Sequence, residues 1–390
     1  MRISHQLFQN RFQIPENWSS IPTYKLFEKI GLITFSRAGF PTFLPIGQRL
    51  VNSVNNIIRE EATRAGFEEV YLPLVQNRTL LENTERADQF SKEFFYTLNN
   101  KLILAPTNEE AYIDLASRAA ISYRHLPIRL FQIADKFRNI KKPKGIFRSK
   151  EFLMCDMVSI DVDEQMLHES AIVFEKIVEA VFRKLEICAV RVDKHRGRYV
   201  EYLVECSEGD IGISRNPDHY DRAGKHSSSV AMYFIFDHGG PNFKGPNDNN
   251  MTSYLGTYGF GIQRCIHAVI EQHRDNLGIA FPESIRPFNS AVIVLDADRT
   301  QQKELAEKCY STLLMVGAKP LFDDRVGKTL KEKASLADFY GIPFKFIIGD
   351  REVNSQTVTI KWRNGKKEEI CLAPEAFLKI LNTRQHVLFM

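Results

Sequence analysis

A change in the pattern of hydrophobic residues near Pro282–Pro287 divides the chain into two kinds of fold. After this point, short apolar stretches alternate with helical ones, at residues 291–295, 301–316, 320–323, 329–340 and 344–348. Strands that alternate with helices are typical of a small α/β domain with parallel pairing. Before this point, strands follow one another through loops, which predicts an α+β domain with an antiparallel sheet flanked by helices. We therefore predict two domains, at residues 1–284 and 288–390.

The first domain is predicted to contain two long helices and a central strand pair. Residues 44–66 and 164–185 place apolar side chains at helical spacing. Residues 129–137 alternate as a strand does, and residues 152–160 return after a loop rich in lysine, proline and glycine. An antiparallel pair joined by a long basic loop is therefore expected.

A further strand is predicted at residues 69–75, where β-forming side chains surround Pro73. Proline has no N–H to donate to a neighbouring strand. This strand is therefore expected at the edge of a sheet or at an interface between subunits.

Composition excludes several classes of protein. Of 390 residues, 44% are hydrophobic and 26% charged, which argues against a disordered chain, a collagen-like chain or a small disulfide scaffold. No run of about 18 apolar residues occurs, so no membrane span is expected. The six cysteines form no C-x-x-C pair, which favours buried thiols in a reducing compartment. A net charge of +4 neither requires nor excludes a nucleic-acid partner, because only a local basic patch would matter.

One candidate phosphate site is Arg138, at the end of the predicted strand, together with the basic loop and Arg148. Arginine presents a planar fork that suits phosphate oxygens. An arginine fixed on a strand also holds a ligand more firmly than one on a loop. The alternative interpretation is a solvated surface strand.

A second candidate is the stretch 256–264, in which Gly259 and Gly261 precede Arg264 and an apolar helix. Glycines let a ligand lie flat against the backbone. Arg264, in the first turn of the helix, is expected to face that glycine strand. The alternative is a tight turn.

A third candidate lies between a predicted strand and a helix, at Thr107 and Glu109. Thr107 is placed to cap the helix, and an acid in the first turn interacts favourably with the helix dipole. Capping alone explains the segment, but a carboxylate there equally suits a substrate ammonium group.

In this order the three segments resemble the motifs of class II aminoacyl-tRNA synthetases, in particular the prolyl-tRNA synthetases. The matching stretches are residues 43–47, 59–66, 73, 106–110, 123–127, 136–138, 148–156, 259–264, 322–325 and 341–344. The resemblance extends from about residue 20 to about residue 365. The chain lacks the editing insertion that is common in bacterial members of the family, and short and organellar members lack it as well.

The resemblance implies a two-step reaction that uses ATP and Mg²⁺. The carboxylate of proline attacks the α-phosphorus, pyrophosphate leaves, and the prolyl group then passes to the terminal ribose of proline-specific tRNA. Arg138 is then expected to hold the α-phosphate and the proline carboxylate. Arg264 is expected to hold the γ-phosphate, Arg148 to help hold the nucleotide, and Gly259 and Gly261 to line the ATP site.

The same resemblance implies roles for four acidic or hydroxyl side chains. Thr107 and Glu109 are expected to bind the imino group of proline, and Asp156 to belong to the same site. Glu201 matches an acidic position before a long strand of the family, and it is expected to contact ATP or to orient the site or its metal.

Some positions depart from the family pattern. Ile140 stands where the second motif usually has an acid, and residues 228–232 replace a Gly-His dipeptide. Two alternatives therefore stay open. One is a paralogue that adenylates proline or another amino or imino acid for a non-tRNA acceptor, and the other is a catalytically silent amino-acid-binding regulator.

The predicted C-terminal domain resembles the anticodon-binding domain of the family. It is rich in basic side chains, among which Arg325 and Lys328 are expected to contact tRNA. The resemblance also implies a homodimer through the first motif, with Pro73 at the interface. The cytoplasm is the expected location, with an organellar matrix as the alternative.

Overall fold

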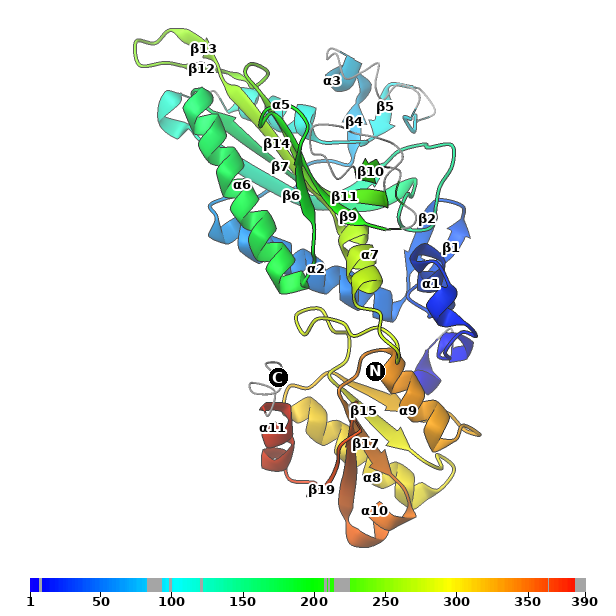
Figure 1. The fold of residues 1–390 in the computed structure, drawn as a ribbon. Coiled ribbons are helices and arrows are strands. Elements are labelled where there is room, and N and C mark those ends of the chain that lie inside the picture. The colour runs from blue at the N-terminus through cyan, green and yellow to red at the C-terminus, as the bar shows by residue number, and fades with distance from the viewer. Residues whose placement is uncertain are drawn as a thin grey trace. The chain divides into compact units, whose positions relative to one another are not determined.

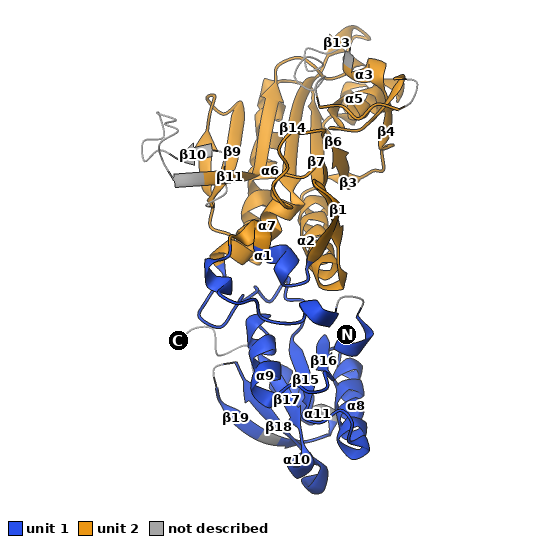
Figure 2. Ribbon diagram, turned by 90° about the vertical axis from the view of Figure 1, so that its right-hand side faces the viewer, with its two compact units in different colours: residues 1–21, 26–32, 273–390 blue, residues 22–25, 33–272 orange. Residues whose placement is uncertain are grey.

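The computed structural model describes residues 1–6, 9–82, 93–97, 100–119, 122–206, 209, 211–213, 225–363 and 365–382. The chain forms two compact units, and each is described by itself (Figure 2). Unit 2 comprises residues 22–25 and 33–272. Unit 1 comprises residues 1–21, 26–32 and 273–390.

Unit 2 is built on an eight-stranded sheet (Figure 1). Its strands lie in the order β3 (Glu68–Glu69), β6 (Ile128–Phe137), β7 (Glu151–Asp161), β14 (Tyr254–Gly261), β11 (Lys225–Phe236), β9 (Tyr199–Glu205) and β8 (Val190–Asp193), and β10 (Ile211–Ile213) pairs with β11. The hydrogen-bonded pairs are antiparallel apart from β3 with β6, which is parallel. The predicted antiparallel sheet is therefore confirmed.

The central pair of this sheet is the predicted one. β6 and β7 are joined by the basic loop, and their register pairs Phe137 with Glu151. Side chains alternate along β7. Cys155 and Met157 are buried on one face, and Met154 and Asp156, at the alternate positions, belong to the face that forms the cavities described below.

Three helices pack together in unit 2, namely α2 (Pro45–Arg64), α6 (Glu164–Leu185) and α7 (Ile262–Gln272). α2 packs against α6 and α7, and α6 packs on β7 and β14. The predicted apolar stripe of α2 is buried at Leu50, Val54 and Ile58. At the start of α6, the carboxylate of Asp163 accepts a hydrogen bond from the Met166 N–H at 2.8 Å, which satisfies one unpaired donor of the first turn.

Smaller elements complete unit 2. They are β1 (Ile33–Arg37) with β2 (Phe40–Phe43), β4 (Val75–Asn77) with β5 (Leu102–Leu104), β12 (Asn242–Lys244) with β13 (Asn250–Thr252), α3 (Arg78–Glu82), α5 (Glu109–Arg118) and η4 (Tyr123–His125). The prediction of one strand over residues 69–75 is wrong. β3 ends at Glu69 and β4 begins at Val75, and Pro73, which cannot donate to a neighbouring strand, lies between them in neither.

Unit 1 contains a five-stranded sheet. Its order is β16 (Pro320–Asp323), β15 (Ser290–Val294), β17 (Phe344–Ile348), β18 (Thr357–Trp362) and β19 (Lys367–Cys371), with helices α8 (Thr300–Met315), α9 (Leu330–Phe339), α10 (Asp350–Ser355) and α11 (Pro374–Asn382). β16, β15 and β17 are parallel, so the predicted α/β domain is confirmed. The antiparallel additions β18 and β19 were not predicted.

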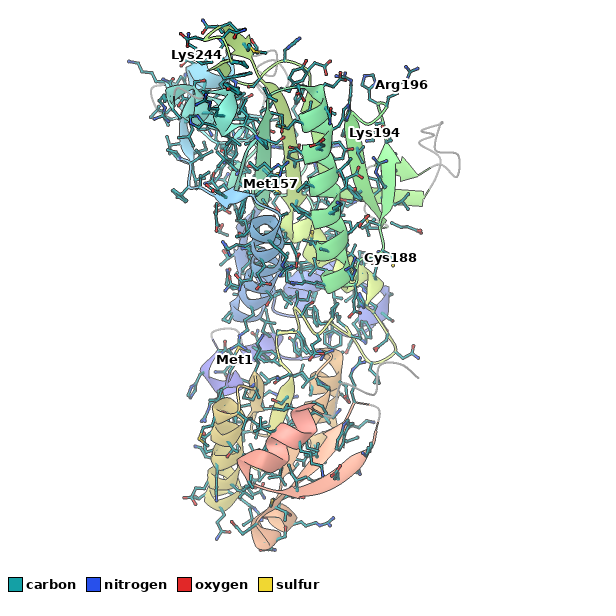
Figure 3. All side chains as sticks on the ribbon, turned by 90° about the vertical axis from the view of Figure 1, so that its left-hand side faces the viewer. Met1, Met157, Cys188, Lys194, Arg196 and Lys244 are labelled. Carbon is teal, nitrogen blue, oxygen red and sulfur yellow. The ribbon has the colours of Figure 1, made fainter. Side chains whose placement is uncertain are left out.

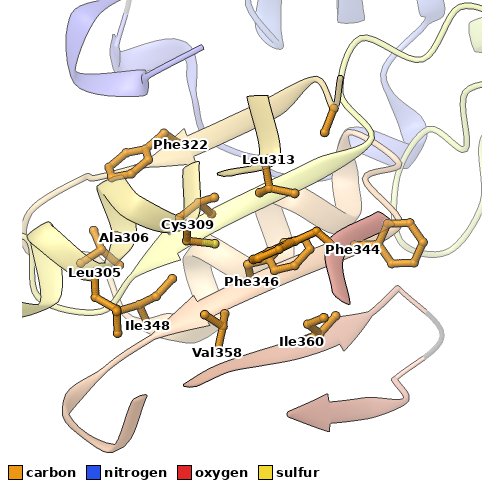
Figure 4. Close-up of a cluster of buried hydrophobic side chains, with 14 of the residues drawn as sticks. Leu305, Ala306, Cys309, Leu313, Phe322, Phe344, Phe346, Ile348, Val358 and Ile360 are labelled. Atoms are coloured by element: carbon orange, nitrogen blue, oxygen red, sulfur yellow. The ribbon is translucent and has the colours of Figure 1, made fainter. Parts of the chain in front are cut away.

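The core of unit 1 lies between this sheet and its helices (Figure 4). Cys309 and Leu313 of α8 pack in one cluster with Phe346, Val358 and Ile360 of the sheet. Burial of large apolar side chains of this kind is the main stabilising contribution to such a domain.

The N-terminal segment groups with unit 1 by its contacts. It contains η1 (Ile3–His5), η2 (Gln9–Arg11), η3 (Trp18–Ser20) and part of α1 (Thr23–Lys29). The Phe322 N–H donates to the Met1 carbonyl at 2.8 Å, and the Tyr340 hydroxyl donates to the Ile30 carbonyl at 2.7 Å. The predicted division at residues 284 and 288 concerns domains along the sequence and stays a prediction. Within the described residues, no helix combines the length and the apolar character that crossing a membrane requires.

Candidate active site

Two adjoining cavities lie in unit 2 on the sheet. The larger cavity has a volume of about 510 Å³ and the smaller about 420 Å³. Arg138, Met154, Met232 and Gly259 line both of them. Because the two cavities share these four residues, a ligand in one and a ligand in the other would meet at Arg138.

The larger cavity collects the predicted phosphate-binding residues. Its lining includes Arg138, Arg148, Gly259, Gly261 and Arg264. A Cβ atom on Gly259 would lie only 2.4 Å from the Met154 Cε atom, so a side chain there would push Met154 aside. Glycine at this position therefore leaves space for a ligand above the backbone of β14.

Arg138 follows directly after β6 and is held from several sides. Its backbone N–H donates to the Lys150 carbonyl at 2.8 Å, and its Nε donates to the Pro106 carbonyl at 3.1 Å. Its guanidinium carbon lies 5.2 Å from the centre of the Phe152 ring, in cation–π range. These contacts fix a positive charge at the boundary of the two cavities.

Arg264 is fixed in the same way in the first turn of α7. Its Nη1 donates to the Ser229 carbonyl at 3.0 Å, and its guanidinium carbon lies 5.7 Å from the centre of the Phe147 ring. The neighbouring Gln263 accepts a hydrogen bond from the Leu153 N–H at 3.0 Å and so ties α7 to β7. Arg264 and its helix are thus anchored to the strands that form the cavity.

The smaller cavity brings together Thr107, Glu109, Asp156 and Arg138. The prediction that Thr107 caps α5 is wrong. The residue before the helix is Asn108, whose side chain makes no capping bond, and the Thr107 hydroxyl donates instead to the Glu109 carboxylate. Two carboxylates therefore line this cavity beside one guanidinium.

Asp156 carries a buried ion pair. Lys136 Nζ lies 2.7 Å from its carboxylate, and the two side chains are 0% and 8% exposed. Burial raises the pKa of Asp156, and the charge of Lys136 opposes this shift. A cation that entered the cavity beside Asp156 would also favour the ionised carboxylate.

Sequence reasoning missed the aromatic wall of the smaller cavity, which consists of Tyr199, Phe234 and Phe236. The Tyr199 and Phe234 rings are stacked, with centres 4.0 Å apart and planes 15° apart. Phe234 and Phe236, like Met232, occupy alternate positions of one strand. That spacing in the predicted strand 230–236 places these side chains on one face, and it was the available signal.

The other predicted residues lie elsewhere. Glu201 is not among the residues that line the two cavities; its carboxylate accepts from the Tyr199 hydroxyl and pairs with Lys194. Its predicted contact with ATP is not supported by this position. Arg325 and Lys328 lie in unit 1, where Arg325 pairs with Asp323 at 2.6 Å and Lys328 is exposed and pairs with Glu332 at 2.9 Å.

Comparisons with known proteins show two matching families and several similar proteins. Residues 94–273 match the family of the class II tRNA synthetase core domain (G, H, P, S and T), and residues 289–384 match the anticodon-binding domain. Similar curated proteins include a proline–tRNA ligase of Rhizorhabdus wittichii, 27% identical over 95% of this chain and 98% of that protein. Another is a proline–tRNA ligase of Ehrlichia canis, 28% identical over 92% and 95%.

Solved structures show the same fold at lower sequence identity. The prolyl-tRNA synthetase of Cryptosporidium parvum in complex with L-proline and AMP has a TM-score of 0.75 and 16% identity, over 96% of this chain and 78% of that chain. The prolyl-tRNA synthetase of Giardia lamblia in complex with prolyl-adenylate has a TM-score of 0.73 and 18% identity, over 93% and 75%.

The chain therefore contains a region that matches the class II tRNA synthetase core, followed by a region that matches an anticodon-binding domain. Within that class it is similar to the prolyl type along almost its whole length. The resemblance stated from the sequence is confirmed.

Proposed function

We propose that the chain is a ligase that activates proline with ATP and transfers the prolyl group to proline-specific tRNA. One observation carries this proposal: Arg138 is shared by a cavity that Arg148 and Arg264 also line and a cavity with two carboxylates and an aromatic wall. In the first step, a proline carboxylate oxygen bonds to the α-phosphorus and pyrophosphate leaves. In the second, a ribose hydroxyl of tRNA attacks the prolyl carbonyl carbon and AMP leaves.

The larger cavity takes ATP. Negative charge develops around the α-phosphate during the first step, and fixed positive groups stabilise that charge without having to reorganise. Arg138 binds the α-phosphate, Arg264 the γ-phosphate, and Arg148 supports the nucleotide. Gly259 and Gly261 let the ligand approach the sheet.

The smaller cavity takes proline. The secondary ammonium of proline has two N–H donors, which the Glu109 carboxylate and the Thr107 hydroxyl accept, with Asp156 nearby as a further negative group. Arg138 holds the proline carboxylate in line with the α-phosphorus. The apolar ring then faces the aromatic wall.

Binding of ATP in this site would bring Mg²⁺ with it. This ion keeps several water ligands and usually binds through one or two carboxylates together with substrate phosphates. The described residues contain no group of three or more candidate metal-ligating side chains, and Glu93 is the carboxylate residue in the lining of the larger cavity. The residues present fit an ion held mainly by the triphosphate, with Glu93 as the protein ligand, where it would neutralise phosphate charge.

The acceptor is tRNA. A match to an anticodon-binding domain supports this, because a carrier-loading paralogue has little use for such a domain. Arg325 and Lys328 are proposed to contribute to its tRNA surface. Retention of Arg138, Thr107, Glu109 and Arg264 in the two cavities argues against a catalytically silent regulator.

The proposal is tested by charging tRNA. Purified protein, labelled proline, ATP and a proline-specific tRNA transcript should give prolyl-tRNA, and omission of ATP should abolish the product. If prolyl-adenylate forms but proline never reaches tRNA, the carrier-loading paralogue is the correct interpretation.

We further propose a homodimer through the segment around Pro73. Tyr71 is 79% exposed and Val75 48% exposed, which is unusual for large apolar side chains next to a sheet edge. Sedimentation analysis should show a dimer for the wild type and a shift toward monomer for Tyr71→Glu. A monomeric wild type contradicts this proposal.

A further inference from the structure

Tyr199 forms one wall of the smaller cavity through a stacked contact with Phe234. The two residues are direct cross-strand partners, on β9 and β11. The next pair on the same face is Glu201 with Met232, and Met232 lines both cavities. Cross-strand neighbours of this kind restrict each other's side chains.

Glu201 does not line the cavity but binds the hydroxyl of Tyr199. The Tyr199 hydroxyl donates to one Glu201 oxygen, and Lys194 pairs with the other. Glu201 is 3% exposed, so its charge is compensated by these two partners in place of water. Figure 3 labels Lys194, which follows β8, and its Nζ lies 4.9 Å from the centre of the Tyr199 ring.

These contacts hold the Tyr199 ring on three sides. Phe234 packs against its face, Lys194 approaches its ring, and Glu201 binds its hydroxyl. A tyrosine ring that is restrained in this way loses little freedom when a ligand packs against it.

We propose that Tyr199 is a specificity-determining residue for the amino acid, and that Glu201 and Lys194 are positioning residues that fix its ring. This inference rests on the proposed function, because it takes the smaller cavity as the amino-acid site. It gives Glu201 a role at the amino-acid end of the reaction, in place of the contact with ATP that the sequence predicted.

The physical effect is discrimination by packing. The ring carbons of proline cover an aromatic wall that a smaller side chain such as that of alanine leaves partly uncovered. One methylene in a hydrophobic pocket changes selectivity by about 10- to 200-fold. Loss of the wall should therefore weaken the preference for proline over alanine within that range.

The first test is ATP–pyrophosphate exchange with Tyr199 variants of the full chain. Tyr199→Ala should raise the KM for proline about tenfold or more, with a change of less than about threefold in the KM for ATP. Tyr199→Phe should lie between Tyr199→Ala and the wild type, because it keeps the stack and loses the bond to Glu201. Tyr202→Phe, on the same strand but on the opposite face, is the matched control and should resemble the wild type.

The second test separates positioning from ATP binding. Glu201→Leu and Lys194→Met should reproduce the rise in the KM for proline, and Glu201→Gln, which still accepts a hydrogen bond, should restore most of the affinity. Thermal unfolding of each variant identifies any loss of folding, and Glu201→Gln remains informative if Glu201→Leu does not fold. A change in the KM for ATP or in kcat, with the KM for proline unchanged, overturns the inference and indicates that Glu201 acts on the nucleotide, as the sequence predicted.

The two proposals fail in different ways. If the wild type activates an amino acid other than proline, the proposed function fails, and the same variants are compared with that amino acid. If the wild type activates proline, and Tyr199→Ala changes neither the KM for proline nor the preference for proline over alanine, the inference about Tyr199 fails while the proposed function stands.

Discussion

At the scale of single residues, two arginines of the cavities are held by hydrogen bonds to backbone carbonyls. Arg138 donates to Pro106 and Arg264 donates to Ser229, so each guanidinium is oriented before a nucleotide arrives. Groups oriented in this way stabilise developing charge because they need no reorganisation during the reaction.

Arg138→Ala and Arg264→Ala should each lower the rate of ATP–pyrophosphate exchange by about 10²-fold or more, the scale expected for loss of one charge-stabilising donor. Arg118→Ala is the control, since Arg118 is exposed and pairs on the surface with Asp114. Exchange near the wild-type rate in either site variant would contradict its assigned phosphate contact.

Individual site residues were predictable from the sequence where chemistry and local spacing coincide. Gly259, Gly261 and Arg264 lie within six residues of one another, and the strand-to-helix transition follows from their composition. Tyr199 and Phe234 are 35 positions apart, and only the register of β9 with β11 brings them together. That register depends on the whole sheet, so no local pattern revealed the stack.

At the scale of elements, residues of β14 line both cavities, and hydrogen bonds on the opposite face of the sheet hold this strand in place. On the helix-covered face, the Tyr258 hydroxyl lies 2.8 Å from the Ser159 Oγ, which donates to Asp161 at 2.5 Å. Ser170 of α6 also donates to Asp161, at 2.7 Å. This buried polar group joins β14 and β7 to α6 beneath the site.

The floor itself is tested by Gly259→Ala. The added Cβ would displace the end of Met154, which lines both cavities. We expect the KM for ATP and for proline to rise several-fold with little change in thermal stability. In a Met154→Ala background, Gly259→Ala should raise these KM values less than it does in the wild type, because the clash with Met154 is then absent. If Gly259→Ala binds both substrates normally, Gly259 does not limit the space above β14.

Asp161 gives the layer beneath the site a defined pH dependence. Burial raises the pKa of Asp161 to about 6, despite hydrogen bonds from Ser159 and Ser170 and the charge of Arg129 that lower it, and Asp163 adds to the rise. A raised carboxyl pKa means that the folded state favours the proton. Protonated Asp161 therefore stabilises the folded state fully below the pKa of the unfolded chain, and this contribution is lost as the pH rises through 6.

Relative to Asp161→Asn, the wild type should lose about 1 kcal/mol of unfolding free energy between pH 5 and pH 7. Denaturant unfolding at both pH values measures this difference. If the unfolding free energy of the wild type, relative to that of Asp161→Asn, stays constant or rises between pH 5 and pH 7, the pKa of Asp161 is not raised.

At the scale of the whole molecule, the two kinds of fold followed from hydrophobic periodicity, because alternating strands and helices differ visibly from successive strands. The grouping of residues 1–21 with residues 273–390 did not. Contacts such as that between Met1 and Phe322 join positions far apart in the chain, and short 3₁₀ segments such as Ile3–His5 carry no periodic signal.

A role for unit 1 in binding tRNA predicts that charge there affects charging but not activation. Lys328→Glu and Lys331→Glu, at exposed positions, should raise the KM for tRNA several-fold and more strongly at low salt, because each lost cation forfeits the release of counterions from a phosphate. ATP–pyrophosphate exchange should stay unchanged. Lys303→Glu, an equal charge change on α8, is the control, and an equal loss with it would point to a general electrostatic effect.

The selection and activation of proline by this chain are tested most directly by ATP–pyrophosphate exchange with each of the twenty amino acids, with and without tRNA. We expect exchange with proline to exceed exchange with alanine by at least about 10²-fold, because Glu109 and an aromatic wall line the smaller cavity. Preference for another amino acid, or no exchange with any of them, would contradict this expectation.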